Sequence, residues 1–289
     1  MLPRYPIYIP SKGRWKSALT AKFLLRDEVP FSLVVEPQEV HNYTEVVPSH
    51  YILTLPFSNL GLGSIPARNW IWEHAKQQGA ERHWVLDDNI REIRRAYKGY
   101  RIPCSAGIAL RVVEDFVDRY ENIAIGGLNY LMFGVDHPPF YLNGHVYSAM
   151  LINTNLPQRW RGRYNEDTDL CLQVLSAGWC TILVNVFLAH KMPSMIMGGG
   201  NTDELYRGDG RLKMARSLER AWPHVVEVDR RYGRPQHVVR DAWKKFDTPL
   251  RRKLGVNFEA LPPVDEYGLQ LKAVQPVKST RLARLLDKT

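Results

Sequence analysis

The 289-residue sequence has few cysteines and no long apolar run, and both absences narrow the class of protein. Cys104, Cys171 and Cys180 cannot all pair with one another and show no CxxC spacing, which argues against a disulfide framework and favours a reducing compartment. No apolar stretch approaches the ~18 residues that a membrane-spanning helix needs. The proline-containing N-terminus is unlike a signal or transit peptide. We therefore expect a cytoplasmic protein that makes no membrane contact.

The composition excludes a disordered or fibrous chain, because 45% of the residues are hydrophobic and 24% are charged. The net charge of +9 is unevenly distributed. Residues 201–289 hold 19 Lys and Arg against 12 Asp and Glu, which leaves an excess of only two positive charges for residues 1–200. A basic C-terminal third indicates a polyanionic partner. A solvated basic face without a partner would give the same charge.

Strand-like and helix-like patterns alternate over the first two hundred residues. Strands are expected at 5–9, 31–35, 51–55, 84–86, 123–125, 145–152 and 181–188, and helices at 67–76, 105–120 and 167–178. This alternation predicts an α/β domain with a mainly parallel sheet and helices on both faces. After the triple glycine at 198–200, residues 205–254 have helical spacing and many arginines. We therefore divide the chain into a domain at 1–200 and a basic, mainly helical extension at 201–289.

Three polar residues, Asp87, Asp88 and Asn89, follow directly after the buried strand expected at 84–86. Ligands of open α/β sheets bind at the carboxyl ends of the strands. Carboxylate and amide oxygens are suitable ligands for Mg²⁺ or Mn²⁺, which bind through few carboxylates together with substrate phosphates. A polar surface turn is the alternative, since Asp and Asn are common in turns.

A second acidic group, Glu166, Asp167 and Asp169, lies where a helix is expected to begin. Helix capping and the helix dipole account for one or two such acids. Three acids exceed what capping requires, and a carboxylate held ionised at a helix N-terminus can act as a base. His190 follows the strand at 181–188, where it could meet the acidic triplet and complete a cation site, although a lone histidine is more often structural.

Taken in order, these features resemble the GT-A fold of nucleotide-sugar-dependent glycosyltransferases over about residues 5–200. The segments that carry the resemblance are Ile9-Pro10-Ser11-Lys12-Gly13-Arg14, Glu36 after the second strand, Ala67-Arg68-Asn69, Leu86-Asp87-Asp88-Asn89, Glu166-Asp167-Thr168-Asp169-Leu170 and His190. They are most similar to the TET-associated glycosyltransferases of bacteriophage DNA hypermodification. That family attaches sugars to 5-hydroxymethylcytosine in DNA.

The resemblance implies a role for each matching position. Nucleotide-sugar contacts are implied for Pro10, Ser11, Arg14, Glu36, Arg68, Asn69, Asp87 and Asp88, and metal contacts for Asp87, Asp88, Asn89 and His190. Glu166 or Asp167 would be the general base, with Asp167 favoured as the second acid of the pair. The implied donor is a UDP-sugar and the implied cofactor is Mn²⁺ or Mg²⁺. Asn89 departs from a strict DxD pattern, which leaves open which of the three residues contacts the metal.

The implied acceptor is double-stranded DNA containing 5-hydroxymethylcytosine. Arg251, Arg252 and Lys253 are the cluster that we expect to meet its phosphates. The methionine- and glycine-rich segment at 192–202 is expected to be a lid or an interdomain linker. No obligate protein partner is evident, and a phage-encoded protein would work in the host cytoplasm. Three alternatives are a glycosyltransferase acting on a glycan or a protein, a nucleotidyltransferase, which also uses paired carboxylates and Mg²⁺, and a non-catalytic nucleic-acid-binding module.

Overall fold

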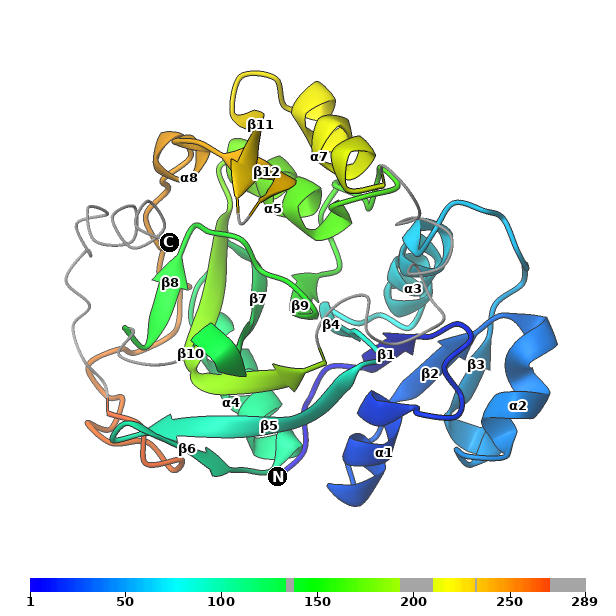
Figure 1. Cartoon of the computed structure of the whole chain (residues 1–289). Helices are drawn as coiled ribbons and strands as arrows, with labels where there is room; N and C mark the ends of the chain where they lie inside the picture. The colour runs from blue at the N-terminus through cyan, green and yellow to red at the C-terminus, as the bar shows by residue number, and fades with distance from the viewer. Residues whose placement is uncertain (134–137, 193–209, 232, 271–289) are drawn as a thin grey trace. The chain divides into compact units, whose positions relative to one another are not determined.

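The computed structural model describes residues 1–133, 138–192, 210–231 and 233–270 (Figure 1). The chain forms two compact units, Met1–Lys253 and Leu254–Thr289. The boundary expected after residue 200, most of the predicted lid at 192–202 and the end of the basic tail lie outside the described residues. Residues 210–253 belong to the first unit. No helix in the described part of the chain is long and apolar enough to cross a membrane.

A sheet of ten strands, counted over the described residues, is the centre of the first unit. Its strands are β1 (Ile7–Pro10), β2 (Ser32–Val35), β3 (Ile52–Thr54), β4 (Arg82–Leu86), β5 (Ile90–Tyr97), β6 (Tyr100–Pro103), β7 (Ile123–Tyr130), β8 (Phe140–Leu142), β9 (Ala149–Asn153) and β10 (Cys180–Lys191). The order is β3-β2-β1-β4-β9-β7-β10-β5-β6, with β8 also paired to β10. Strands β3, β2, β1, β4, β7, β10 and β6 run in one direction, and β9, β5 and β8 run against them. The mainly parallel α/β sheet is thus confirmed.

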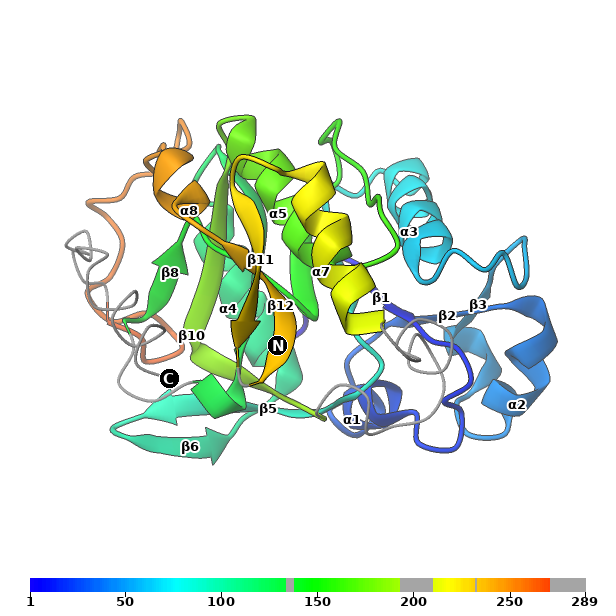
Figure 2. The ribbon, with the colours of Figure 1, turned by 45° about the horizontal axis from the view of Figure 1, so that its top comes forward.

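Helices cover both faces of this sheet (Figure 2). They are α1 (Leu19–Arg26), α2 (Val40–Thr44), α3 (Ile65–Gln77), α4 (Ala106–Val117) and α5 (Glu166–Ser176). Neighbouring residues of β4 show the two layers, because side chains alternate along a strand. Val85 belongs to the apolar cluster that α3 and α5 form on one face. Trp84 points to the other face and donates its indole N–H to Glu114 of α4, at 2.9 Å.

The region expected to be helical after residue 205 contains a β-hairpin. Between α7 (Gly210–Ala221) and α8 (Ala242–Lys245), strands β11 (Val226–Arg231) and β12 (Arg234–Val239) pair antiparallel. The helical spacing therefore identified α7 correctly, but the prediction of helices throughout was wrong. Local sequence explains the difference. Pro223 follows α7 and cannot continue a helix, because proline lacks the backbone N–H. Gly233 takes the left-handed conformation, with φ 72°, that a hairpin turn between two valine-containing segments favours.

Candidate active site

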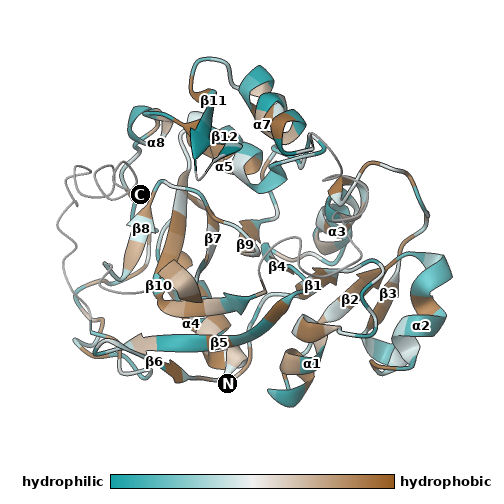
Figure 3. Cartoon of the chain, in the orientation of Figure 1, coloured by the Kyte–Doolittle hydropathy of each residue, from teal (hydrophilic) through white to brown (hydrophobic). Residues whose placement is uncertain are grey.

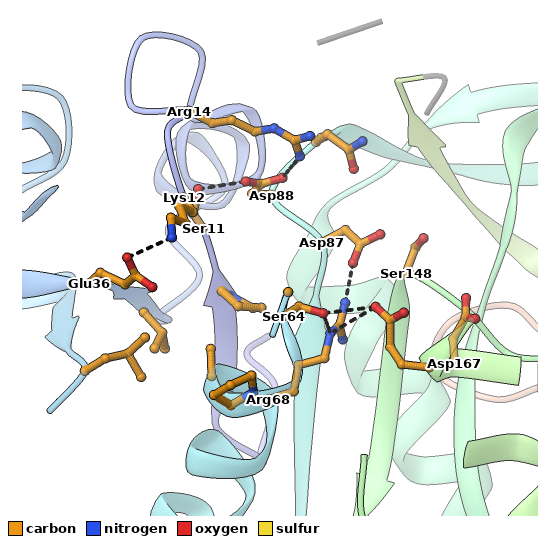
Figure 4. Close-up of a pocket in the computed structure, with 18 of the residues that line it drawn as sticks. Ser11, Lys12, Arg14, Glu36, Ser64, Arg68, Asp87, Asp88, Ser148 and Asp167 are labelled. Carbon is orange, nitrogen blue, oxygen red and sulfur yellow. Dashed lines mark hydrogen bonds and ion pairs between the residues drawn. The ribbon is translucent and has the colours of Figure 1, made fainter. Parts of the chain in front are cut away.

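A pocket of about 310 Å³ opens at the carboxyl ends of β1 and β4, where ligands of open α/β sheets bind (Figure 4). Ten residues selected from the sequence line it, namely Pro10, Ser11, Arg14, Glu36, Arg68, Asp87, Asp88, Asn89, Glu166 and Asp167. Further lining residues used below are Lys12, Ser64, Tyr130, Ser148 and Lys191. The two acidic groups, about eighty residues apart in the sequence, therefore face one cavity.

Asp88 is held by the loop that follows β1. One carboxylate oxygen accepts a hydrogen bond from the Ser11 hydroxyl at 2.8 Å, and the other pairs with the Arg14 guanidinium at 2.5 Å. The Tyr43 hydroxyl lies 2.6 Å from that of Ser11 and continues the network. Burial raises the pKa of Asp88, and Arg14 and Ser11 oppose that effect. The Ser11–Arg14 loop is thereby fixed against the end of β4.

Asp87 is paired with two cations. The carboxylate accepts from Arg68 Nη2 at 2.9 Å and from Lys191 Nζ at 2.7 Å (Figure 4 shows the Arg68 contact). Burial would raise the pKa of Asp87, but Lys191 and Arg68 outweigh it and lower that pKa to about 2. Burial lowers the pKa of Lys191, but Asp87 and Tyr130 more than reverse this, so its pKa is raised. Both groups are therefore charged at neutral pH.

Arg68 connects the two acidic groups. It lies in the first turns of α3, and its side chain is only 10% exposed. Besides pairing with Asp87, its Nε donates to the Ser64 hydroxyl at 3.3 Å and lies 3.7 Å from Glu166. The Trp160 ring covers the guanidinium at 4.7 Å. Asp87, Glu166 and Asp167 all raise the pKa of Arg68 against the effect of burial.

Glu166 and Asp167 open α5, and their pKa values are shifted in opposite directions. Burial raises the pKa of Glu166, which accepts a hydrogen bond from the Ser64 hydroxyl at 3.0 Å. Burial would also raise the pKa of Asp167, but His145, 3.3 Å away, together with the Thr168 amide and Arg68, outweighs this and holds that pKa well below its usual range. The Thr168 amide donates to the other Asp167 oxygen at 2.7 Å. Asp167 is the acid of this pair that is held ionised.

Three residues of the site were missed in the sequence analysis: Lys191, Ser148 and His145. Lys191 Nζ donates to the Ser148 hydroxyl at 2.8 Å as well as to Asp87. Ser148 has a φ of 59°, which is uncommon for a non-glycine residue and is often found near functional sites. Its carbonyl oxygen accepts from the Asp87 amide at 2.7 Å. The sequence signal available for Lys191 was its position at the end of the strand, next to His190.

An ion pair between two loops lines one side of the pocket. Lys12 Nζ lies 3.0 Å from Glu36, whose other oxygen accepts from the Asn59 amide at 3.1 Å. These contacts join the loops after β1, β2 and β3. Asn69, which was expected to contact the nucleotide, does not line the pocket. Its side chain instead exchanges two hydrogen bonds with the backbone of Trp160.

The four residues expected to bind metal do not form a ligand set. His190 does not line the pocket, and its Nδ1 lies 3.1 Å from Glu92 on β5. A β-bulge between His190 and Lys191 shifts the register there, and Lys191 is the residue that reaches Asp87. Asp87 and Asp88 are already paired with cations, as described above. Among the described residues, no group of three His, Cys, Asp or Glu could hold a metal ion.

Asn89 has a possible ligand atom that no other group in the described part of the protein uses. Its Oδ1 is buried and has no hydrogen-bond partner, while its amide donates to the Met192 carbonyl at 3.4 Å. A single amide oxygen is a weak donor set for Mg²⁺ or Mn²⁺. The side chains present thus do not fit a preformed divalent-cation site.

The basic cluster at residues 251–253 lies at the far end of the sheet from the pocket. The Arg251 amide donates to Asn122, directly before β7, whereas Tyr130 at the other end of β7 lines the pocket. Arg251 is also paired with Glu121 at 2.9 Å. The structure therefore does not bring this cluster to the candidate site.

Comparisons with known proteins identify the family of the chain. No curated protein matches the chain. A putative nucleotide-diphospho-sugar transferase from Desulfovibrio desulfuricans has a similar solved structure, with 10% identity, a TM-score of 0.37, and coverage of 63% of this chain and 80% of that one. The family model of the TET-associated glycosyltransferases matches residues 5–200, which is more than half of the chain. The chain therefore belongs to the TET-associated glycosyltransferase family and is a glycosyltransferase.

Proposed function

We propose that this glycosyltransferase moves a sugar from a UDP-sugar to the hydroxyl group of 5-hydroxymethylcytosine in double-stranded DNA, with Asp167 as general base. The observation that carries the proposal is the arrangement around Arg68. This one buried guanidinium pairs with Asp87 at the end of β4 and interacts with Glu166 and Asp167 at the start of α5. Donor-binding and proton-accepting groups thus share one pocket.

The donor's diphosphate is anionic, and the pocket offers it several positive groups. Lys12, Arg14, Arg68 and Lys191 all line the cavity, and each is paired with an acid that lines it too, so the diphosphate would have to share these cations with the acids. The N-terminal turn of α3 also borders it and contains no acidic residue. Backbone N–H groups at a helix N-terminus attract phosphate oxygens, and the helix dipole adds to this attraction. We assign the nucleotide and its diphosphate to this side of the pocket.

The transfer step needs a base on the acceptor side and positive charge on the donor side. As the acceptor hydroxyl oxygen bonds to the sugar C1, Asp167 accepts the hydroxyl proton. The bond between C1 and the diphosphate oxygen breaks, and UDP leaves with the electron pair. Lys191 and Arg68 supply the cationic environment that stabilises the departing diphosphate. We derive no step through a divalent cation, because the acids that would hold it are already paired.

His145 has a supporting role in this scheme. Its Nε2 lies 3.3 Å from Asp167 Oδ2. The imidazole ring also packs edge-on against the ring of Tyr147, with 4.9 Å between the two ring centroids. This contact fixes the carboxylate and favours its charged form before the acceptor arrives. We regard His145 as a positioning residue for Asp167.

The decisive experiment is mass spectrometry of nucleosides from 5-hydroxymethylcytosine DNA treated with the protein and a panel of nucleotide sugars. A hexose or N-acetylhexosamine mass increment on the modified nucleoside supports the proposal and identifies the donor. Hydrolysis of a UDP-sugar without any increment would move the acceptor to a glycan or a protein. Neither increment nor hydrolysis, with DNA still bound, would favour a non-catalytic nucleic-acid-binding module.

A further inference from the structure

Strands β5 and β6 form a hairpin that starts at the active site. Ile90 opens β5 directly after Asn89, a residue of the pocket. The hairpin turns at Lys98 and Gly99, which have φ values of 48° and 80°, as a tight two-residue turn requires. Among the strands of the described residues, β6 is the last in the sheet order, so its outer side is an edge of the sheet (Figure 1).

This hairpin is strongly basic and carries exposed aromatic residues. Residues 90–103 contain five Lys or Arg and one acid, Glu92. Tyr97 is 48% exposed and Tyr100 is 72% exposed. Figure 3 shows the outer part of β5 as hydrophilic, in contrast to the hydrophobic strands at the centre of the sheet. Cations next to exposed tyrosines are suited to a phosphate backbone and its bases.

Helices pack against one face of the hairpin near Ile93, and the opposite face carries Arg94 and Arg101 together with the acid Glu92, which pairs with Arg94 at 2.8 Å. Helices α1 and α4 contact β5, and Ile93 is only 3% exposed. Arg94 alternates with Ile93, so it points to the opposite face. In the strand register, Arg101 of β6 lies opposite Ala96 and His190 of β10 lies opposite Glu92. Because Glu92 and Ala96 share the face of Arg94, Arg101 and His190 lie on that face too. This face thus adjoins the β10 residues that lead to Lys191.

The length of the hairpin fits several nucleotides of an acceptor. Seven residue steps from Ile90 to Tyr97 span roughly 23 Å at the usual rise of a strand. Successive phosphates of one DNA strand are spaced about 3.4 Å apart along the duplex, so this length matches about seven of them.

We propose that the β5–β6 hairpin, through Arg94 and Arg101 on one face and through Lys98 and Tyr100 at its exposed tip, binds the phosphate backbone of the DNA acceptor and leads it to the pocket. This inference rests on the proposed function. It replaces the cluster at residues 251–253 as the acceptor surface, because the hairpin begins at the pocket and that cluster lies at the other end of β7.

The test compares two variants that each lose three cations. The hairpin variant is Arg94→Gln/Lys98→Asn/Arg101→Gln, and the control is Arg251→Gln/Arg252→Gln/Lys253→Gln. Binding to duplex DNA is measured by fluorescence anisotropy over a range of salt concentrations, and UDP binding by calorimetry. The hairpin variant should lower the salt slope by about two to three, since each phosphate contact contributes about 0.9. Its UDP affinity should stay within twofold of wild type.

The control variant should change the salt slope by less than one. A hairpin variant that retains the wild-type slope while the control loses it would overturn the inference. Should the triple variant unfold, Lys98→Asn/Tyr100→Ala, which changes only exposed residues, must still weaken DNA binding.

Assays of the wild-type protein distinguish a failure of the proposed function from a failure of the hairpin assignment. Wild-type protein that binds DNA through the hairpin but adds no sugar to 5-hydroxymethylcytosine contradicts the function and leaves the surface assignment standing. Wild-type protein that binds no DNA contradicts both.

Discussion

Lys191 Nζ lies 2.7 Å from Asp87 Oδ2, so the first acid of the Asp87-Asp88-Asn89 triplet is paired with a lysine at the end of β10. Both side chains are mostly buried, at 13% and 22% exposure, and Arg68 holds the other Asp87 oxygen. This pair joins two strands that are not neighbours in the sheet. The same ion pair therefore stabilises the fold and places a positive charge where we propose that the diphosphate binds.

Replacing Lys191 by Met should therefore affect both stability and donor binding. Losing one partner of a buried ion pair costs about 3–5 kcal/mol, because the remaining charge is uncompensated. We expect Lys191→Met to lower the free energy of unfolding by about 3 kcal/mol, with Asp87→Asn/Lys191→Met less destabilised than the sum of the single variants. Urea denaturation of the four proteins in the cycle measures this coupling. Strict additivity of the two changes would contradict a direct pair.

Donor binding should not depend strongly on added metal. Lys191, Arg68 and Arg14 already lie in the pocket as positive groups, and the acids that would hold a cation are engaged. We expect the dissociation constant of UDP, measured by calorimetry in EDTA, to change by less than tenfold, or about 1.4 kcal/mol, when Mn²⁺ is added. A requirement for Mn²⁺ of a hundredfold or more would mean that the metal displaces Lys191 from Asp87.

Removing the charge of Asp167 should stop sugar transfer without preventing donor binding. General base catalysis contributes about 10²–10⁴-fold, so Asp167→Asn should lower the transfer rate to DNA by that factor while UDP affinity stays nearly unchanged. The matched control is Asp241→Asn, because Asp241 is 83% exposed and its left-handed φ of 52° suits Asn. A transfer rate within threefold of wild type for Asp167→Asn would assign the base elsewhere.

The sequence was sufficient to find the acids, because each group follows a recognisable local signal. Asp87 and Asp88 come directly after a buried strand, and Glu166 and Asp167 open a helix with clear periodicity. Parallel-sheet geometry then brings the ends of such elements to one edge. Prediction of these positions needed no knowledge of long-range contacts.

The partners of the acids could not be found in this way. Whether His190 or Lys191 reaches the pocket depends on the β-bulge between them, and a shift of one residue exchanges the faces of a strand. Ser148 and His145 reach the site through the pairing of β9 with β4 and through contact with α5. The β5–β6 hairpin was missed because its charged residues obscure the period-two pattern of a strand.

Acid should destabilise the protein through His83, a core histidine away from the pocket. Burial, with a smaller contribution from Arg159, lowers the pKa of His83 to about 3. In the unfolded chain His83 binds a proton near pH 6.5, whereas in the folded protein it stays neutral until the pH approaches 3. The contribution of neutral His83 to the free energy of unfolding is therefore fully present above pH 6.5 and decreases as the pH drops towards 3. Between pH 6.5 and 4.5 the expected loss is about 2 kcal/mol.

The measurement is urea denaturation at both pH values for wild type and His83→Phe. The variant should lack this pH dependence, whatever its absolute stability. The low pKa of Asp87 does not interfere, because its contribution is lost only below about pH 4. An equal pH dependence in the two proteins would exclude His83 as the cause.

Gly127 should be indispensable for the pairing that positions Ser148 and Tyr130. A Cβ atom at this position of β7 would overlap the carbonyl oxygen of Ala149 and the side chain of Val146. Overpacking of this kind costs about 1–3 kcal/mol, so Gly127→Ala should lower the unfolding free energy by about 2 kcal/mol. It should also weaken UDP binding, since β7 ends at Tyr130 and β9 begins next to Ser148, both of which contact Lys191. Gly144→Ala is the control, because a Cβ there meets no atom within 4 Å. Equal stability of the two variants would show that β7 and β9 can separate without disturbing the site.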